Sequence, residues 1–174
     1  DALGLGSLGE DVAREWQTMA ARLVDAQAPG LAQRVREAAA GVREGVDWPE
    51  RTLQRLGLLQ LACDAIARRA ELDAATAADL RALVGWPTDK DEVLGAGEAV
   101  ADRWTVLGVA VEERDDKLIE RRVWLHGRTS ARRAWLLDHA HGGRGFEQSW
   151  VAGASVNAKL VFFPGAASLR ALCA

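Results

Sequence analysis

The chain has 174 residues, of which 49% are hydrophobic and 27% are charged, and its formal net charge is −3. This length allows a sizeable core in one domain or in two small ones. The composition is ordinary for a soluble globular protein. No apolar run approaches the roughly 18 residues that predict a membrane span, so we expect no membrane partner.

The two ends of the sequence predict a fragment of a longer protein. The first residues, DALGLGSLGED, contain no initiator Met and no signal peptide, and the last residues, LRALCA, stop within an apolar pattern. The two cysteines, Cys63 and Cys173, lie far apart and imply no disulfide framework. We therefore expect the reducing cytoplasm as the compartment.

Helical periodicity runs through residues 1–97. A capping box at Ser7–Glu10 predicts a first helix that ends before Pro29-Gly30, and Pro29 suits the first turn of a second helix. Asp73 can cap a fourth helix, which ends at Gly85, and residues 88–94 can form one short further helix.

The third helix begins at Trp48 and has the strongest apolar pattern of the helical half. Its predicted inward stripe recurs every three to four residues and consists of Leu53, Leu56, Leu59, Cys63 and Ile66. Leu58, Leu61 and Ala62 broaden this face. We expect this helix to be central to the helical half.

Beyond residue 97 the apolar period changes to two, which is typical of strands. Residues 104–113, 118–126, 132–139 and 156–163 are the predicted strands, and residues 166–173 are the predicted C-terminal helical turn. The fold class is therefore α+β: four to five helices over residues 1–97, then an antiparallel meander of about four strands over residues 98–174. The two halves could form one continuous domain or two.

The predicted hairpins mix cations with aromatic side chains. In residues 118–126, Ile119, Arg121, Val123 and Leu125 form the more apolar face, which leaves Trp124 on the other face between Arg122 and His126. The candidate binding residues are Arg121, Arg122, Trp124, His126, Arg132, Arg133 and Trp135.

Three interpretations are open for this Arg/Trp surface. An exposed Trp flanked by cations is typical of a protein-binding hot spot. Basic side chains beside stacking rings can also bind nucleic acid, although the positive excess over residues 114–145 is far below that of a dedicated nucleic-acid domain. Alternatively, a helix of the N-terminal half covers this face of the sheet.

Asp138, His139 and His141 are the candidate metal ligands. Two histidines two residues apart on a strand project to one face, as a metal pair would. Two imidazoles are only half of a zinc site, so a metal-dependent enzyme is the third hypothesis. No Gly-x-Ser-x-Gly or Walker pattern accompanies them, and we expect no catalytic residues.

Six segments resemble, in order, bacterial SWIM zinc finger family proteins: ARLVDAQAPGLAQRVRE, WPERTLQRLGLLQL, LRALVGWPTDKDEVL, DRWTVLGVAVEE, RRVWLHGRTSARRAWLLDHAHGG and LVFFPGAASLRAL. In that family the resembling region follows a zinc-binding module with a Cys-x-Cys … Cys-x-His pattern. No such pattern is present here, because Cys63 and Cys173 are isolated. The resemblance implies the portion C-terminal to the zinc module, with no zinc or other cofactor of its own.

The resemblance also implies a non-enzymatic interaction or adaptor role. SWIM modules are thought to bind DNA or protein, and such proteins are often encoded beside MoxR-type AAA+ ATPases and von Willebrand A-like proteins. A protein partner of one of these two classes is therefore expected. The resemblance supplies no catalytic residue.

Overall fold

The computed structural model describes residues 10–42, 44–113, 118–141, 145–146 and 148–174. The chain divides into two compact units, Asp1–Pro87 and Thr88–Ala174, here called the helical unit and the β unit. The predicted α+β class is confirmed, because helices precede the strands of one antiparallel sheet. The capping box at Ser7–Glu10 lies largely outside the described residues.

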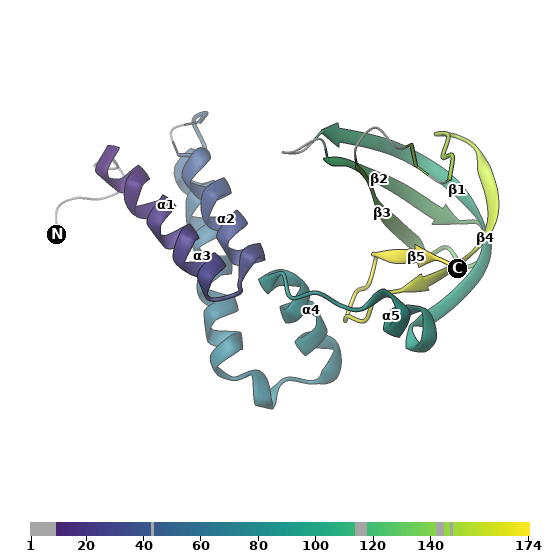
Figure 1. Cartoon of the computed structure of the whole chain (residues 1–174), viewed down its shortest axis with the longest axis horizontal. Coiled ribbons are helices and arrows are strands. Elements are labelled where there is room, and N and C mark those ends of the chain that lie inside the picture. Colours follow the sequence, from purple (N-terminus) through teal and green to yellow (C-terminus); the bar gives the residue numbers. More distant parts are fainter. Residues whose placement is uncertain (1–9, 43, 114–117, 142–144, 147) are drawn as a thin grey trace. The chain divides into compact units, whose positions relative to one another are not determined.

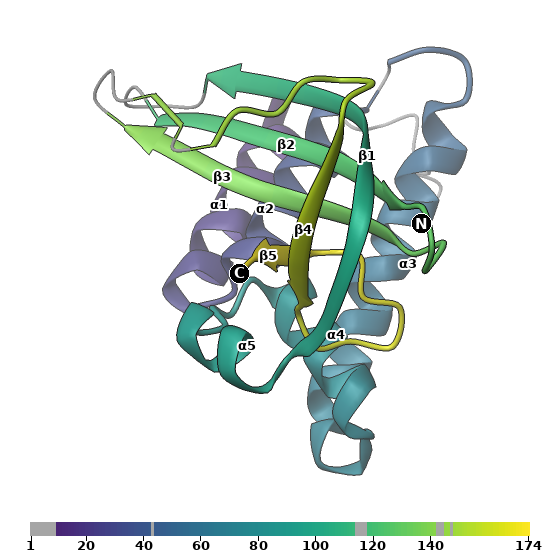
Figure 2. The same ribbon diagram turned by 90° about the vertical axis from the view of Figure 1, so that its right-hand side faces the viewer.

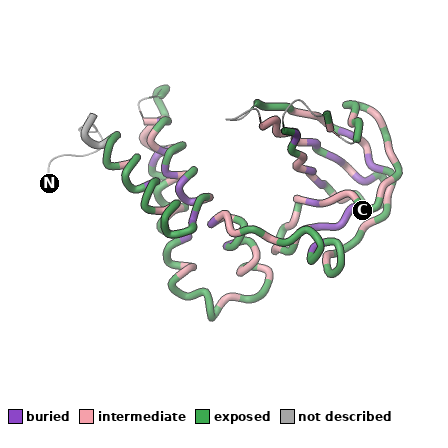
Figure 3. Tube along the Cα trace, in the orientation of Figure 1, coloured by how far each residue is buried: buried purple, intermediate pink, exposed green. Residues whose placement is uncertain are grey.

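The helical unit contains α1 (Glu10–Asp25), α2 (Pro29–Ala40), α3 (Trp48–Ala67), a 3-10 turn (Arg69–Glu71) and α4 (Ala74–Val84). Its core consists of small and branched apolar side chains. Figure 3 marks the buried positions along these helices in purple. The buried members are Ala20, Ala28, Leu31, Ala32, Val35, Ala62, Leu80 and Val84. Among the described helices, none is long and apolar enough to cross a bilayer.

The turns that the sequence marks with Pro and Gly lie against each other. Gly85 ends α4 with φ of 88°, and a Cβ there would lie 2.5 Å from the amide nitrogen of Gly30. The indole of Trp86 donates to the carbonyl of Gln27 at 2.9 Å. Glycine at both positions therefore lets the start of α2 contact the end of α4.

The predicted inward stripe of α3 is wrong in part. Leu53 is 68% exposed, and Leu56 and Cys63 are also exposed, whereas Thr52 and Ala62 are buried. Arg55 lies on the same side as Ala62 and donates to the Glu37 carbonyl at 2.7 Å, which turns that side toward α2. Because α3 is apolar on most of its circumference, periodicity alone could not indicate the buried side.

The β unit contains α5 (Lys90–Ala96), β1 (Glu98–Glu113), β2 (Leu118–Gly127), β3 (Arg133–His141), β4 (Ser155–Phe162) and β5 (Ala171–Cys173). The sheet order is β3-β2-β1-β4-β5, so β1 to β3 form a meander and β4 pairs with the other edge of β1 (Figures 1 and 2). The β unit begins at Thr88, so residue 97, the predicted end of the helical half, lies inside it. The helix α5 belongs to the β unit because it contacts β4 and β5.

The long strand β1 pairs with two neighbouring strands. Its first half pairs with β4, and its second half pairs with β2, with an irregularity between Val106 and Gly108. A bulge of this kind bends a strand and increases its twist, as curved sheets require. The core of the β unit includes Trp104, Val106, Val123, Leu125, Leu160 and Phe162.

The predicted C-terminal helical turn is wrong. Residues 171–173 form β5, where Ala171 pairs with Phe162 and Cys173 pairs with Leu160. The edge of β4 offers free backbone groups to this segment, and pairing with them satisfies more hydrogen bonds than one isolated helical turn. The parallel bridge between Trp135 and Arg170 then brings β5 near β3.

Candidate functional site

Alternation along β2 separates the candidate residues onto two faces. Arg121, Val123 and Leu125 are buried, as predicted from the sequence, whereas Trp124 between them is 41% exposed. The face that carries Trp124 is here called the outer face. It consists of Arg122, Trp124 and His126 of β2 and of Arg133, Trp135, Leu137 and His139 of β3.

Two tryptophans form the centre of the outer face. Trp124 and Trp135 are direct cross-strand partners, and Gly108 of β1 lies opposite Trp124 on the other side. A Cβ at Gly108 would lie 3.8 Å from Cε3 of Trp124, so the indole lies across the glycine. Trp124 thus stands between Gly108 and Trp135 on three paired strands.

Most cations around these rings have partners. Arg122 forms an ion pair of 2.6 Å with Glu120, and His139 lies 3.8 Å from the same carboxylate. The guanidinium of Arg170, which the sequence did not single out, lies 5.8 Å from the Trp135 ring centroid and 4.3 Å from that of Phe163. Burial lowers the pKa of Arg170.

Arg121 lies apart from the other candidate residues, inside the β unit. Its Nε and Nη2 donate to Oδ2 of Asp138 at 3.1 and 2.6 Å, and its Nη1 donates to the Gln148 carbonyl at 2.7 Å. The guanidinium also lies 4.0 Å from the centroid of the Phe146 ring. A cation bound in this way links β2 and β3 to Phe146 and Gln148.

The proposed metal ligands do not share one face. Asp138 points inward to Arg121, and its neighbours His139 and His141 project to the opposite side of β3. Among the described residues, no three His, Cys, Asp or Glu side chains are grouped so that they could hold a metal ion. The structure therefore does not bring the three candidates together.

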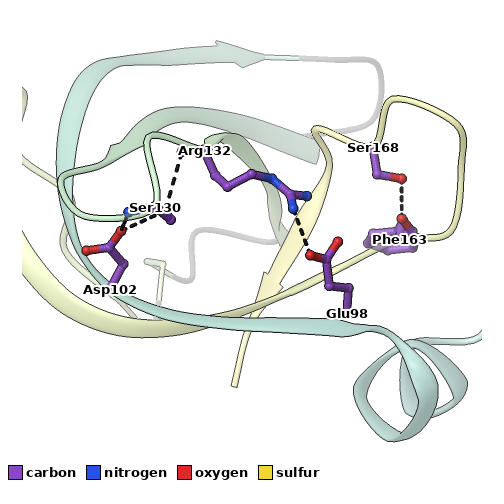
Figure 4. A network of polar contacts seen from close by, with 6 residues as sticks. All are labelled: Glu98, Asp102, Ser130, Arg132, Phe163 and Ser168. Carbon is purple, nitrogen blue, oxygen red and sulfur yellow. Dashed lines mark hydrogen bonds and ion pairs between the residues drawn. The ribbon is translucent and has the colours of Figure 1, made fainter.

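Arg132 and Asp102 stabilise the turn between β2 and β3 (Figure 4). Arg132 forms an ion pair of 2.8 Å with Glu98 and covers the ring of Phe162 at 4.4 Å from its centroid. Asp102 accepts hydrogen bonds from the amides of Thr129 and Ser130 and from the Ser130 hydroxyl at 2.7 Å. The Ser130 bonds, foremost its amide, hold the pKa of Asp102 well below its usual range.

Residues 2–84 match the family model described as the SWIM-associated four-helix bundle domain. The match covers α1 to α4, the four helices of the helical unit. No curated protein and no solved structure matches the chain. The resemblance to SWIM zinc finger proteins is thereby confirmed for this region: residues 2–84 are similar to the SWIM-associated four-helix bundle domain.

Proposed function

We propose that the chain is a non-enzymatic interaction module of a SWIM-type zinc finger protein and that the outer face of the β unit binds a protein partner in the cytoplasm. The observation that carries this proposal is the exposed indole of Trp124 beside Trp135 on a paired sheet. Exposed Trp and Arg side chains on a rigid surface supply much of the binding energy in protein interfaces.

The expected partner is the MoxR-type AAA+ ATPase or the von Willebrand A-like protein that the family resemblance suggests. The outer face presents Arg133, which is exposed, and Arg122, whose side chain is 40% exposed. An acidic patch beside an apolar pocket on the partner would complement this surface. The chain needs no cofactor for this role, and zinc belongs to the separate SWIM module.

The test measures binding of the purified chain to the ATPase and to the von Willebrand A-like protein encoded with it. Trp124→Ala should weaken binding by about 2 kcal/mol, roughly 30-fold, with an unchanged circular dichroism spectrum. Leu61→Ala, which truncates a 67% exposed side chain of α3 in the helical unit, is the matched control. Equal affinities of the two variants for the partner would contradict the proposal.

Nucleic-acid binding by the hairpins is the second candidate. It is favoured by exposed Arg133 next to the Trp124–Trp135 pair, because bases stack on such rings. Arg121, Arg122 and Arg132 already form ion pairs, which leaves fewer cations for phosphates. Binding of single-stranded DNA or RNA that falls steeply with salt would support this function, and no binding at low salt would exclude it.

A further inference from the structure

A cleft of about 870 Å³ lies within the β unit between β3 and β5. Its walls are formed by residues 136–141 of β3 and residues 171–173 of β5, with Lys90 and Leu94 of α5 at one side. Arg121 and Phe146 also line it. The volume is within the range of roughly 300–1,000 Å³ that is typical of ligand sites.

The cleft exists because β3 and β5 separate after a single contact. The Trp135 amide donates to the Leu169 carbonyl at 2.7 Å, and Trp135 and Arg170 form a parallel bridge. Beyond this point the described parts of the two strands are not paired with each other. The sheet therefore curls toward closure (Figure 2). Residues of β3 and of β5 line the cleft.

The edge of β3 presents backbone groups to this cleft. The Gly127 amide donates to the Arg132 carbonyl at 2.9 Å, which makes this a hydrogen-bonded pair of the β2–β3 ladder. Hydrogen-bonded and non-hydrogen-bonded pairs alternate along an antiparallel ladder. The backbone N–H and C=O groups of every second residue from Arg132 onward are therefore directed to β2. The backbone groups of Leu137, His139 and His141 are consequently directed away from β2, on the same side as the Trp135 amide.

The same reasoning applies to β5. The Phe163 amide donates to the Arg170 carbonyl, and the Ala174 amide donates to the Lys159 carbonyl, both at 2.9 Å. The backbone N–H and C=O groups of Arg170, Leu172 and Ala174 are therefore directed to β4. Those of Ala171 and Cys173, which alternate with them, are directed to the other side, toward β3. Among the described residues, these outward backbone groups beyond Trp135 have no backbone partner, so two strand edges of donors and acceptors face one space, which is the arrangement that an extended backbone can complete.

The side chains of the cleft indicate what such a backbone should carry. Leu136, Ala140 and Ala171 are buried and apolar and would receive alternate apolar side chains. Lys90 supplies positive charge at one side of the cleft, whereas the charge of Arg121 is already neutralised by Asp138. The lining therefore favours an acidic residue among the apolar ones.

We propose that this cleft binds an extended peptide segment of a partner protein, with alternating apolar residues and at least one acidic residue, which adds as a strand to the edge of β3. Backbone hydrogen bonds supply affinity in this mode of recognition, and pockets for alternate side chains supply specificity. The cleft does not include Trp124, so Trp124→Ala distinguishes this site from the proposed outer-face site, although Leu137 and His139 of β3 belong to both.

The test begins with selection of phage-displayed random dodecapeptides on the full chain. The enriched sequences should alternate apolar residues with at least one Asp or Glu. A labelled synthetic copy of the most enriched peptide then serves as the probe in fluorescence anisotropy. Trp124→Ala should bind this probe as the unmodified chain does.

The decisive pair of variants differs in one backbone amide. His139→Ala removes the imidazole and keeps the N–H that faces the cleft, whereas His139→Pro removes this N–H and leaves the ladder with β2 intact. The peptide should bind His139→Ala nearly as tightly as the unmodified chain and His139→Pro about tenfold more weakly. Thermal melts of both variants establish that each is folded.

A second measurement needs no substitution. Hydrogen exchange of the amides of Leu137, His139 and Cys173 in the unmodified chain should slow when the peptide binds, because these amides become hydrogen-bonded. Protection confined to residues around Trp124 would overturn the proposal. So would equal affinity for the two His139 variants, failure to select any peptide, or a dimer of the chain that His139→Pro dissociates, because the occupant would then be a second copy.

Discussion

At the scale of single residues, Asp102 shows how one carboxylate can hold a turn. Its oxygens accept hydrogen bonds from the amides of Thr129 and Ser130 and from the Ser130 hydroxyl. These donors stabilise the ionised carboxylate, so the pKa of Asp102 is lower in the folded chain than in the unfolded chain. The unfolded chain therefore binds a proton at this site at a higher pH than the folded chain does.

The stability of the β unit should depend on pH through this residue. Asp102 contributes stability above its unfolded pKa, about 3.9, and this contribution is lost as pH falls below that value. Asp102→Asn should therefore lower the free energy of unfolding near neutral pH, and the difference from the unmodified chain should shrink below about pH 4. Chemical denaturation at a series of pH values, from about 2.5 to about 7, measures this difference.

Glu113→Gln is the control, since it removes an exposed carboxylate near the other end of β1. Its effect on unfolding should be small at every pH. An Asp102→Asn variant that follows the unmodified chain over the whole pH range would show that the turn does not depend on the charge of Asp102.

Arg121 marks the limit of residue-level prediction for the candidate site. Alternation along residues 118–126 correctly assigned Arg121 to the inner face and Trp124 to the outer face. Alternation does not identify partners, however, and no local pattern indicates that Asp138, Gln148 and Phe146 converge on Arg121. The cleft between β3 and β5 likewise depends on chain closure, which a local pattern does not encode.

At the scale of elements, local signals predicted those parts of the fold that depend on neighbours in sequence. Pro29 begins α2, Asp73 caps α4 through the amides of Ala75 and Thr76, and the period of two identified the strands that became β1 to β4. The short strand β5 was missed because its conformation depends on pairing with β4, which no local pattern reveals. The buried side of α3 was also assigned incorrectly.

The corrected orientation of α3 predicts which substitutions this helix tolerates. Leu53 and Leu61 are 68% and 67% exposed, whereas Ala62 is 2% exposed. Replacing both leucines by Gln should change the free energy of unfolding by no more than about 0.5 kcal/mol each. Ala62→Gln should cost at least about 2 kcal/mol, because it overpacks a helix contact and buries an amide.

Chemical denaturation of the two variants, followed by the loss of helical circular dichroism in the far ultraviolet, compares these effects directly. The orientation of α3 predicted from the sequence places Leu53 on the buried stripe and Ala62 at its side. It therefore predicts that the double leucine variant is less stable than Ala62→Gln. That order of stabilities would refute the orientation of α3.

At the scale of the whole molecule, each unit has a core of its own. The largest cluster of the β unit contains only residues of that unit, from Trp104 to Ala171, and the clusters of the helical unit contain only residues before Pro87. Independent cores are the property that lets a segment fold alone. Residues 88–174 should therefore fold without the helical unit.

The start of α5 decides where the β unit begins. Val93 of α5 is 2% exposed, and α5 contacts β4 and β5. A fragment of residues 88–174 should melt cooperatively and show the circular dichroism of a β protein, whereas a fragment of residues 98–174 should be less stable by roughly 2 kcal/mol, because burial of Val93 is lost. Equal stabilities would place the boundary at residue 97, and an unfolded longer fragment would mean that the β unit needs the helical unit to fold.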